Sequence, residues 1–122
     1  MGVPTSRRLR KRSEFQRVRN KGLRVSTEPF LFQCCVVKKG PVAVRRLGVI
    51  ASRRVGNAVK RNRGKRLVRE LFRINESSLP SDCDLVVILR SSFDRYSFEE
   101  LETRYLRMCM EISKKLKNSE CL

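Results

Sequence analysis

The segment from Val55 to Ile74 constrains the fold most, because apolar residues recur at regular intervals within a run of arginine and lysine. At 100° per residue, the spacing of an α-helix, its positions fall into two arcs. One arc holds Gly64, Leu67, Val68, Leu71, Phe72 and Ile74, and the other holds Asn62, Arg63, Lys65, Arg66, Arg69 and Arg73. This pattern predicts a helix that buries one side against the protein and exposes a basic side.

Two residues of this helix carry further information. A glycine costs about 1 kcal/mol of helix propensity relative to alanine, so we interpret Gly64 as the point where the helix backbone closely approaches a sheet. Glu70 is the only acid in the segment and is expected to pair with Arg66, four residues before it. A solvated face balanced by acids would carry more glutamates, so we disfavour that explanation of the basic side.

The charge balance indicates a polyanionic partner. The 122 residues include 29 lysines and arginines and only 12 acids, for a formal net charge of +17, far more than solubility requires. Residues 1–73 contain 22 of the basic residues and 3 of the acids, so we expect the binding surface there. The length predicts one domain over residues 1–122, which the charge marks as a polyanion-binding domain. Residues 1–12 are basic and without periodicity, so we expect them to form a mobile arm.

Several classes of protein are disfavoured. No apolar run approaches the ~20 residues of a membrane helix, and no signal peptide follows the basic N-terminus, so we expect a cytoplasmic protein. The five cysteines are odd in number and lack a C-x-x-C spacing, which predicts small buried side chains rather than disulfides or a zinc site. There is no histidine, the commonest general base. The commonest general base and metal ligand is therefore missing from the residues that this chain could use.

The other predicted elements complete a single small α/β domain, an α+β two-layer sandwich on a mixed sheet of about four strands. A short helix is expected from an N-cap at Ser13, with Gln16 as its capping-box partner, to Gly22. Strands are expected within Phe30–Lys39, Val42–Ser52 and Asp84–Arg90. A long helix should open with a capping box of Ser97 and Glu100, and its apolar stripe is Phe98, Leu101, Tyr105, Met108, Ile112 and Leu116. The order strand, helix, strand predicts a parallel βαβ unit, and such crossovers are right-handed in ~98% of cases.

A helix face covered with arginine and lysine suits a phosphate backbone, since guanidinium groups bind phosphate bidentately and neutralised phosphates release counterions. The block LGVIASRRVGNAVKRNRGKRLVRELFR, Leu47 to Arg73, resembles the signature of the bacterial ribonuclease P protein subunit, in which V-G-N-A-V leads into R-N-R-x-K-R. Upstream, Arg10–Gly22, with E-F-x-x-V and a closing glycine, is similar to the first helix of that family. The resemblance covers nearly the whole chain and implies a left-handed βαβ crossover instead of the common right-handed one.

The resemblance implies a protein subunit that is not itself the catalyst. Family members bind a catalytic RNA, and the two together hydrolyse precursor tRNA to remove its 5′ leader, with magnesium held mainly by the RNA. The expected partners are this RNA and precursor tRNA, with no protein partner required. By residue matching, the catalytic RNA contacts Arg53, Arg54, Asn57, Arg61, Asn62, Arg63, Lys65, Arg66 and Arg69. A cleft between the first helix and the sheet would hold the single-stranded leader through Lys11, Phe15, Arg19, Leu31 and Gln33.

The first predicted strand presents two faces. Phe30, Phe32 and Cys34 point one way, and Leu31, Gln33 and Cys35 point the other. Residue chemistry alone favours the phenylalanines at the leader, because a base stacked on an aromatic ring gains ~1–3 kcal/mol. The family resemblance puts them in the core and the other set at the leader, and we adopt that register. Phe15 fits a core position as well as a cleft position.

Two residues depart from the family pattern, and two other functions share some of these features. Arg19 stands where many relatives have a second aromatic residue, and Gly64 replaces a bulky apolar residue. A ribosomal-type RNA-binding protein or an RNA chaperone would have similar charge and size, but would not need the ordered helix block. A stand-alone nuclease would need its own acids, and residues 1–73 offer only Glu14, Glu28 and Glu70.

Overall fold

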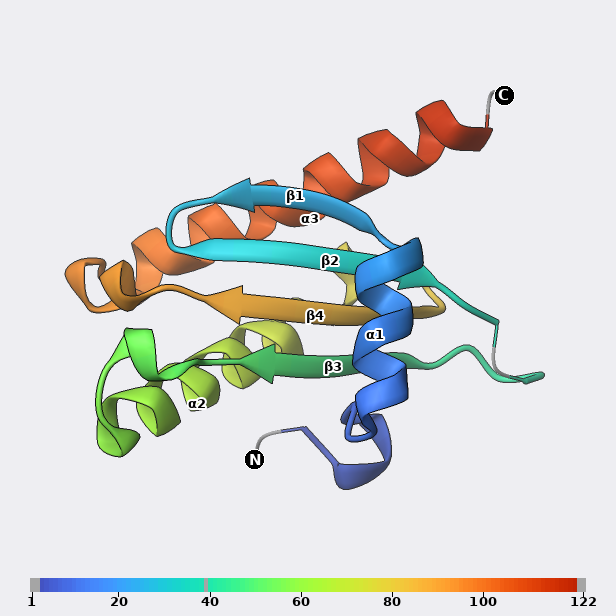
Figure 1. Cartoon of the computed structure of the whole chain (residues 1–122). Helices are drawn as coiled ribbons and strands as arrows, with labels where there is room; N and C mark the ends of the chain where they lie inside the picture. The colour runs from blue at the N-terminus through green and yellow to red at the C-terminus, as the bar shows by residue number, and fades with distance from the viewer. Residues whose placement is uncertain (1–2, 39, 121–122) are drawn as a thin grey trace.

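The computed structural model describes residues 3–38 and 40–120. A four-stranded sheet in the order β1-β2-β4-β3 forms its centre (Figure 1). The strands are β1 (Leu23–Thr27), β2 (Phe30–Val36), β3 (Arg45–Ile50) and β4 (Cys83–Leu89). The α-helices are α1 (Arg12–Lys21), α2 (Ala58–Ile74) and α3 (Phe98–Glu120). Within the described residues, no helix is both long and apolar enough to cross a membrane.

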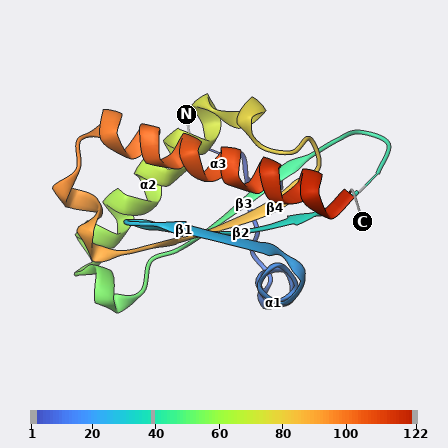
Figure 2. The same cartoon turned by 90° about the horizontal axis from the view of Figure 1, so that it is seen from above.

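The sheet lies between two layers of helices. Helices α2 and α3 cover one face, and α1 lies against the other (Figure 2). Strand β2 pairs antiparallel with β1 and β4, whereas β3 and β4 are parallel. The predicted mixed sheet of about four strands is therefore confirmed. Strand β1 was not among the predicted segments, because Val25 is its only buried residue and its pattern is correspondingly weak.

The connection from β3 through α2 to β4 is left-handed. The arrows of β3 and β4 point the same way in Figure 1, α2 lies behind them, and β4 lies above β3. A right-handed connection in the same strand order would place α2 on the face that α1 covers. The crossover thus follows the family resemblance and departs from the general preference.

The main core lies between the sheet and the pair α2 and α3. Phe30 and Phe32 are fully buried, and their ring centroids lie 6.4 and 5.1 Å from that of Tyr105 on α3. The prediction that both phenylalanines lie in the core is confirmed. The predicted stripe of α3 is buried from Leu101 to Ile112, but Phe98 is 41% exposed because it stands in the first turn, before the helix meets the sheet.

Helix α2 approaches the sheet closely at Gly64. A Cβ at this position would overlap the Cδ2 atom of Leu89 and would lie 3.2 Å from the ring of Phe93. The predicted close approach is confirmed, and Leu89 and Phe93 fill the space of a larger residue. Ile74, predicted on the buried arc, is 44% exposed because it is the last residue of the helix.

The start of α1 differs from the prediction. The helix begins at Arg12, with Lys11 as its N-cap, and the carboxylate of Glu14 accepts the main-chain N–H groups of Arg10 (3.1 Å) and Lys11 (3.0 Å). The predicted cap at Ser13 is therefore wrong. The carboxylate accepts hydrogen bonds from two main-chain N–H groups at the helix start, whereas a capping serine hydroxyl typically accepts from one. Gly22 ends the helix as expected.

Residues 3–11 pack against the sheet, which differs from the predicted mobile arm. Val3 and Leu9 are 3% and 6% exposed, and Leu9 N–H donates to the Leu47 carbonyl at 2.9 Å. The short helix η1 (Thr5–Arg7) lies between these two anchors. Two isolated apolar residues within a basic run thus fix the segment to the edge of β3.

Three of the cysteines are buried side chains, as predicted. Cys34, Cys83 and Cys109 lie in the core between the sheet and α3. A hydrogen bond with Cys83, together with burial, raises the pKa of the Cys34 thiol, and burial raises the pKa of Cys109 to about 12. The thiols of Cys34 and Cys109 therefore stay protonated at neutral pH, and Cys35, on the other face of β2, is half-buried. Cys121 lies outside the described residues.

Replacing Gly64 with alanine tests the close approach. The added methyl group overpacks the contact with Leu89, which costs about 1–3 kcal/mol, against a gain of about 1 kcal/mol in helix propensity. We expect Gly64→Ala to lower the free energy of unfolding by about 1 kcal/mol, measured by urea denaturation. Val59→Ala, at a 74% exposed position of the same helix, is the control and should change it by less than about 0.5 kcal/mol. A Gly64→Ala protein as stable as the wild type would contradict this packing.

Candidate nucleic-acid interface

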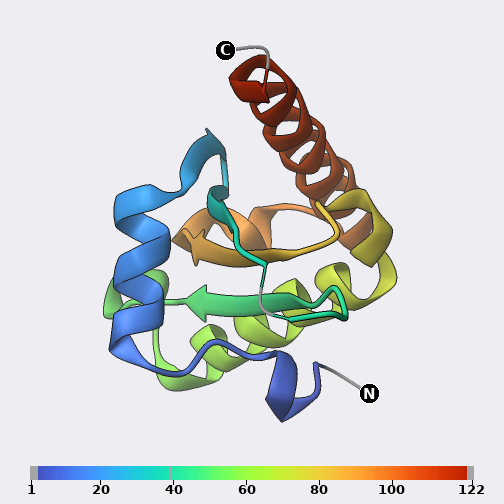
Figure 3. The ribbon, with the colours of Figure 1, turned by 90° about the vertical axis from the view of Figure 1, so that its right-hand side faces the viewer.

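A cleft lies between α1 and the sheet face opposite α2 and α3. Figure 3 shows α1 on the side of the sheet opposite α3. The cleft has a volume of about 270 Å³ and is lined by Arg12, Phe15, Gln16, Arg19, Gln33, Ile50 and Ile88. Its floor is formed by Ile50, Ile88 and the amide of Gln33, which is 3% exposed on β2, and α1 adds two arginines and the amide of Gln16. Apolar, amide and cationic groups together suit a ligand with flat rings and negative charge.

An ion-pair network fixes α1 beside this cleft. Asp84 of β4 has no exposed surface, and its two carboxylate oxygens accept from Arg46 of β3 at 2.9 and 3.0 Å. Arg17 of α1 donates to the same carboxylate at 3.1 Å. Arg46 also donates to Glu14 of α1 at 2.6 Å. Two strands and the helix therefore share one connected set of charges.

The local electrostatics keep the network ionised. Burial alone would raise the pKa of Glu14, but the N–H groups of Lys11 and Arg10 and the charge of Arg46 outweigh it and lower that pKa. Hydrogen bonding to Asp84 raises the pKa of Arg46 against the opposing effect of burial. Both side chains are charged at neutral pH, so the network is intact there.

Phe15 belongs both to the cleft and to a small apolar cluster. Its half-buried ring packs with Leu9, Val18 and Val86. The ring also lies over Gly48 of β3, where a Cβ would come within 2.5 Å of it. The core and cleft interpretations of Phe15 therefore both describe its position, with one side of the ring packed and the other at the cleft.

The cleft contains three of the five residues predicted for the leader. Phe15, Arg19 and Gln33 line it. Leu31 lies on the same face of β2 and is half-buried but does not line it, and Lys11 is exposed at the start of α1.

Four lining residues were not predicted: Arg12, Gln16, Ile50 and Ile88. Arg12 and Gln16 share the helix face of Arg19 by their spacing, a signal that the sequence offers. Ile50 and Ile88 are direct partners on parallel strands. Their proximity follows from strand register, which the sequence alone does not give.

The basic side of α2 and the turn before it form the second surface. Asn57 caps the helix by accepting Lys60 N–H at 2.9 Å, while Arg53 and Arg54 lie exposed in η2 (Arg53–Val55). The helix presents, exposed or half-buried, Arg61, Asn62, Arg63, Lys65, Arg66 and Arg69. All nine residues predicted for the RNA subunit therefore lie on one stretch from η2 along α2.

The cations of this surface lack acidic partners within the chain. Over residues 3–38 and 40–120, none of the predicted arginines, nor Lys65, forms an ion pair. The expected pairing of Glu70 with Arg66 is wrong, because Glu70 accepts from Arg73 at 2.7 Å instead. Lys60, outside the predicted set, is the residue of this helix that pairs with Asp94, at 3.0 Å. The surface is thus available to an external polyanion.

Comparison with known proteins gives one consistent result. A family model described as Ribonuclease P matches residues 3–113. The "Ribonuclease P protein component" of Shouchella clausii is 43% identical over 96 residues, covering 79% of this chain and 77% of that protein. That of Brevibacillus brevis is 36% identical, covering 84% and 80%. The solved RNase P protein of Thermotoga maritima aligns with a TM-score of 0.74 at 33% identity, covering 86% of this chain and 96% of its own.

Asp84→Asn tests the network. The amide keeps the shape of the side chain but leaves two arginines beside a neutral group, and breaking a buried ion pair in this way costs about 3 kcal/mol. We expect a loss of that size in the free energy of unfolding, measured by urea denaturation at neutral pH. Asp94→Asn, which removes the exposed carboxylate that pairs with Lys60, is the control and should have little effect. Equal stability of the two variants would contradict the role of Asp84.

Proposed function

The chain belongs to the ribonuclease P protein family, and from that membership we propose that it assists an RNA subunit, which performs the catalysis, in removing the 5′ leader of precursor tRNA. The chain has no histidine to act as a general base, which supports catalysis by the RNA. The work would take place in the cytoplasm and require no further protein. The observation that carries the proposal is the basic surface of η2 and α2, whose predicted arginines and Lys65 form no ion pair with the residues that the structure describes, together with the cleft beside α1.

The surface from Arg53 to Arg69 would bind the RNA subunit. Its guanidinium groups offer paired donors to phosphate oxygens, and their charges would displace counterions from the RNA. Asn57 is occupied as the cap of α2, so its contribution is to hold the helix start in place. Asn62, exposed among the cations, offers an amide to a base edge or a 2′-hydroxyl.

The cleft would bind the leader as a single strand. Phe15 offers a ring face for stacking, and the planar guanidinium of Arg19 can stack or pair with a phosphate. Gln16 and Gln33 place amide groups where unpaired bases would expose their edges. Lys11, outside the cleft, would add charge at the entrance.

Magnesium would be held mainly by the RNA subunit. Among the residues that the structure describes, no cluster of three or more cysteine, aspartate and glutamate side chains is arranged to hold a metal ion. The ions would activate water and stabilise the leaving oxygen, while the protein supplies binding and orientation.

A reconstitution assay tests this proposal. The RNA subunit of the same organism is given a precursor tRNA with a short 5′ leader at low magnesium concentration, with and without the protein. We expect strong stimulation of cleavage by the protein and none by the protein without RNA. Tight RNA binding without stimulation would refute the proposed role.

Two single substitutions should separate the two surfaces. Arg66→Ala, on α2, should weaken binding of the RNA subunit and reduce the slope of log K against log salt concentration by about one, the loss of one phosphate contact. Arg19→Ala, on α1, should leave that binding unchanged and weaken by up to about tenfold the affinity of the assembled enzyme for precursor with a leader.

Each of these variants is the control for the other, because both remove one exposed arginine. RNA-subunit binding is measured by filter retention at several salt concentrations, and precursor binding with leaders of different length. If both substitutions weakened both equilibria equally, the division into two surfaces would be wrong.

A further inference from the structure

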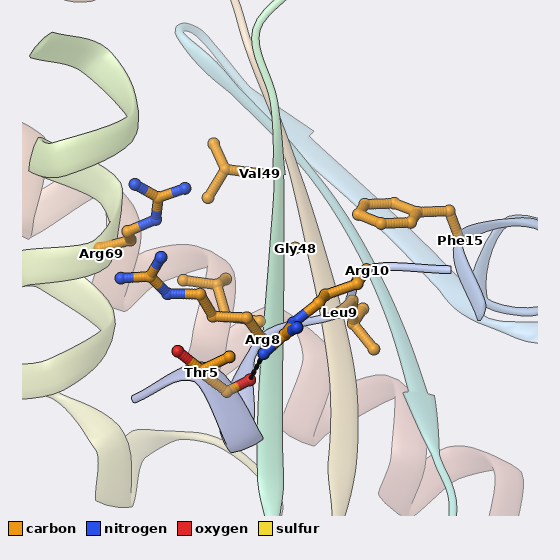
Figure 4. A pocket seen from close by; sticks show the side chains of 9 residues that line it. Thr5, Arg8, Leu9, Arg10, Phe15, Gly48, Val49 and Arg69 are labelled. Atoms are coloured by element: carbon orange, nitrogen blue, oxygen red, sulfur yellow. Dashed lines mark hydrogen bonds between the residues drawn. The ribbon is translucent and has the colours of Figure 1, made fainter. Parts of the chain in front are cut away.

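We propose that Arg8 and Arg69 together bind one backbone phosphate of an RNA strand, in a pocket that connects the cleft with the basic surface of α2. The inference rests on the proposed function and adds a site that joins the two surfaces. The pocket has a volume of about 280 Å³ and lies beside β3, between the N-terminal segment and α2. Figure 4 shows Arg8 and Arg69 on one side of β3 and Phe15 on the other.

The two arginines form an uncompensated pair of like charges. Both are half-buried, and the nearby Arg8 charge adds to burial in lowering the pKa of Arg69. In the described part of the chain neither side chain meets a carboxylate, and the one side-chain bond of this pair is from Arg8 Nε to the Val3 carbonyl at 2.8 Å. Two cations in a partly desolvated pocket repel each other, and an anion between them would relieve that repulsion.

The neighbouring acids are committed to other partners. Glu14 pairs with Arg46, and Glu70 pairs with Arg73. Glu76 pairs with Arg7, the residue next to Arg8 in the chain. Since these carboxylates are engaged, the anion that completes the pocket has to come from outside the chain.

Phosphate is the anion that this pocket suits. Two guanidinium groups can together donate several hydrogen bonds to its oxygens. Val49 adds a main-chain donor: Leu47 directs its carbonyl to the outer edge of β3, and alternation along a strand directs the N–H of Val49 to the same edge. The pocket therefore offers donors from two guanidinium groups and one main-chain N–H.

The position of Phe15 explains why the phosphate would belong to a strand. Its ring lines both this pocket and the leader cleft, and it can lie against β3 there because Gly48 has no side chain. A base stacked at Phe15 would have its adjoining phosphate within reach of Arg8. Alternatively, the phosphate could belong to the RNA subunit bound on α2, and would then approach the pocket past Arg69.

The test is a double-mutant cycle with Arg8→Gln, Arg69→Gln and the double variant. Two equilibria are measured: binding of the RNA subunit alone, and binding of precursor with a long or a minimal leader by the assembled enzyme. Each single variant should lose about tenfold in one of them, as expected for a charged hydrogen bond. If both arginines hold one phosphate, the double variant should lose much less than the product of the single losses.

The equilibrium that changes identifies the source of the phosphate. A loss confined to precursor with a long leader assigns it to the leader strand, and a loss with the RNA subunit alone assigns it to that RNA. Lys114→Gln, at an exposed position on α3 that pairs with Glu111, is the charge-matched control and should change neither.

Arg8→Lys separates binding from folding, because it keeps the charge but lacks the Nε–H group that bonds to the Val3 carbonyl. Its affinity should lie between those of wild type and Arg8→Gln, and thermal unfolding of all variants is compared by circular dichroism. Losses that multiply in the double variant, or an Arg8→Gln protein that binds as well as Lys114→Gln, would overturn the shared site. A wild-type protein that fails to stimulate the RNA subunit would instead refute the proposed function.

Discussion

The buried carboxylate of Asp84 is the group on which the arrangement of α1, β3 and β4 depends. A charge with no exposed surface is costly unless partners replace its water, and here the partners are Arg46 and Arg17. One lies on the neighbouring strand and the other on the helix across the sheet face, so the charge is compensated only when all three elements are in place. Glu14 extends the network to the first turn of α1. The width of the cleft, and with it the position of Arg19, follows from this set of ion pairs.

The pairing of acids elsewhere in the protein leaves the arginines of η2 and α2 as an exposed basic surface. Glu14 and Asp84 are engaged on the α1 face, and Glu70 and Glu76 pair with Arg73 and Arg7. Within residues 3–38 and 40–120, the remaining arginines of η2 and α2 have no acidic partner, so they repel one another in the free protein. RNA binding would remove this repulsion and release counterions as well, which is the physical basis of the expected salt dependence.

The parts of the fold that the sequence predicted are those with a strong period or a specific local signal. The helical period of α2 predicted which residues are buried and which form the basic side, and Gly64 predicted the close approach to the sheet. The capping box of Ser97 and Glu100 formed as expected, with hydrogen bonds of 3.0 and 3.1 Å. The wrong or missing predictions are of two kinds: which of several neighbouring residues forms a hydrogen bond, and which residues distant in sequence come together. The side chain of Glu14, and not that of Ser13, caps the start of α1. Glu70 pairs with Arg73, three residues later, and not with Arg66, four residues earlier. Ile50 and Ile88 meet in the cleft only because β3 and β4 pair in one particular register.

The departure of Gly64 from the family pattern connects the core to the functional surface. Because this position has no side chain, Leu89 and the ring of Phe93 fill the contact and α2 lies close to the sheet. The same ring lies 5.9 Å below the guanidinium of Arg63, so the packing that replaces the missing side chain also orients part of the basic side. The depth of α2 against the sheet also sets how far Arg69 lies from the edge of β3, where Leu9 holds the segment that carries Arg8. A larger residue at position 64 would push α2 outward and separate the two arginines, so the charge pair at the β3 edge depends on the packing at Gly64.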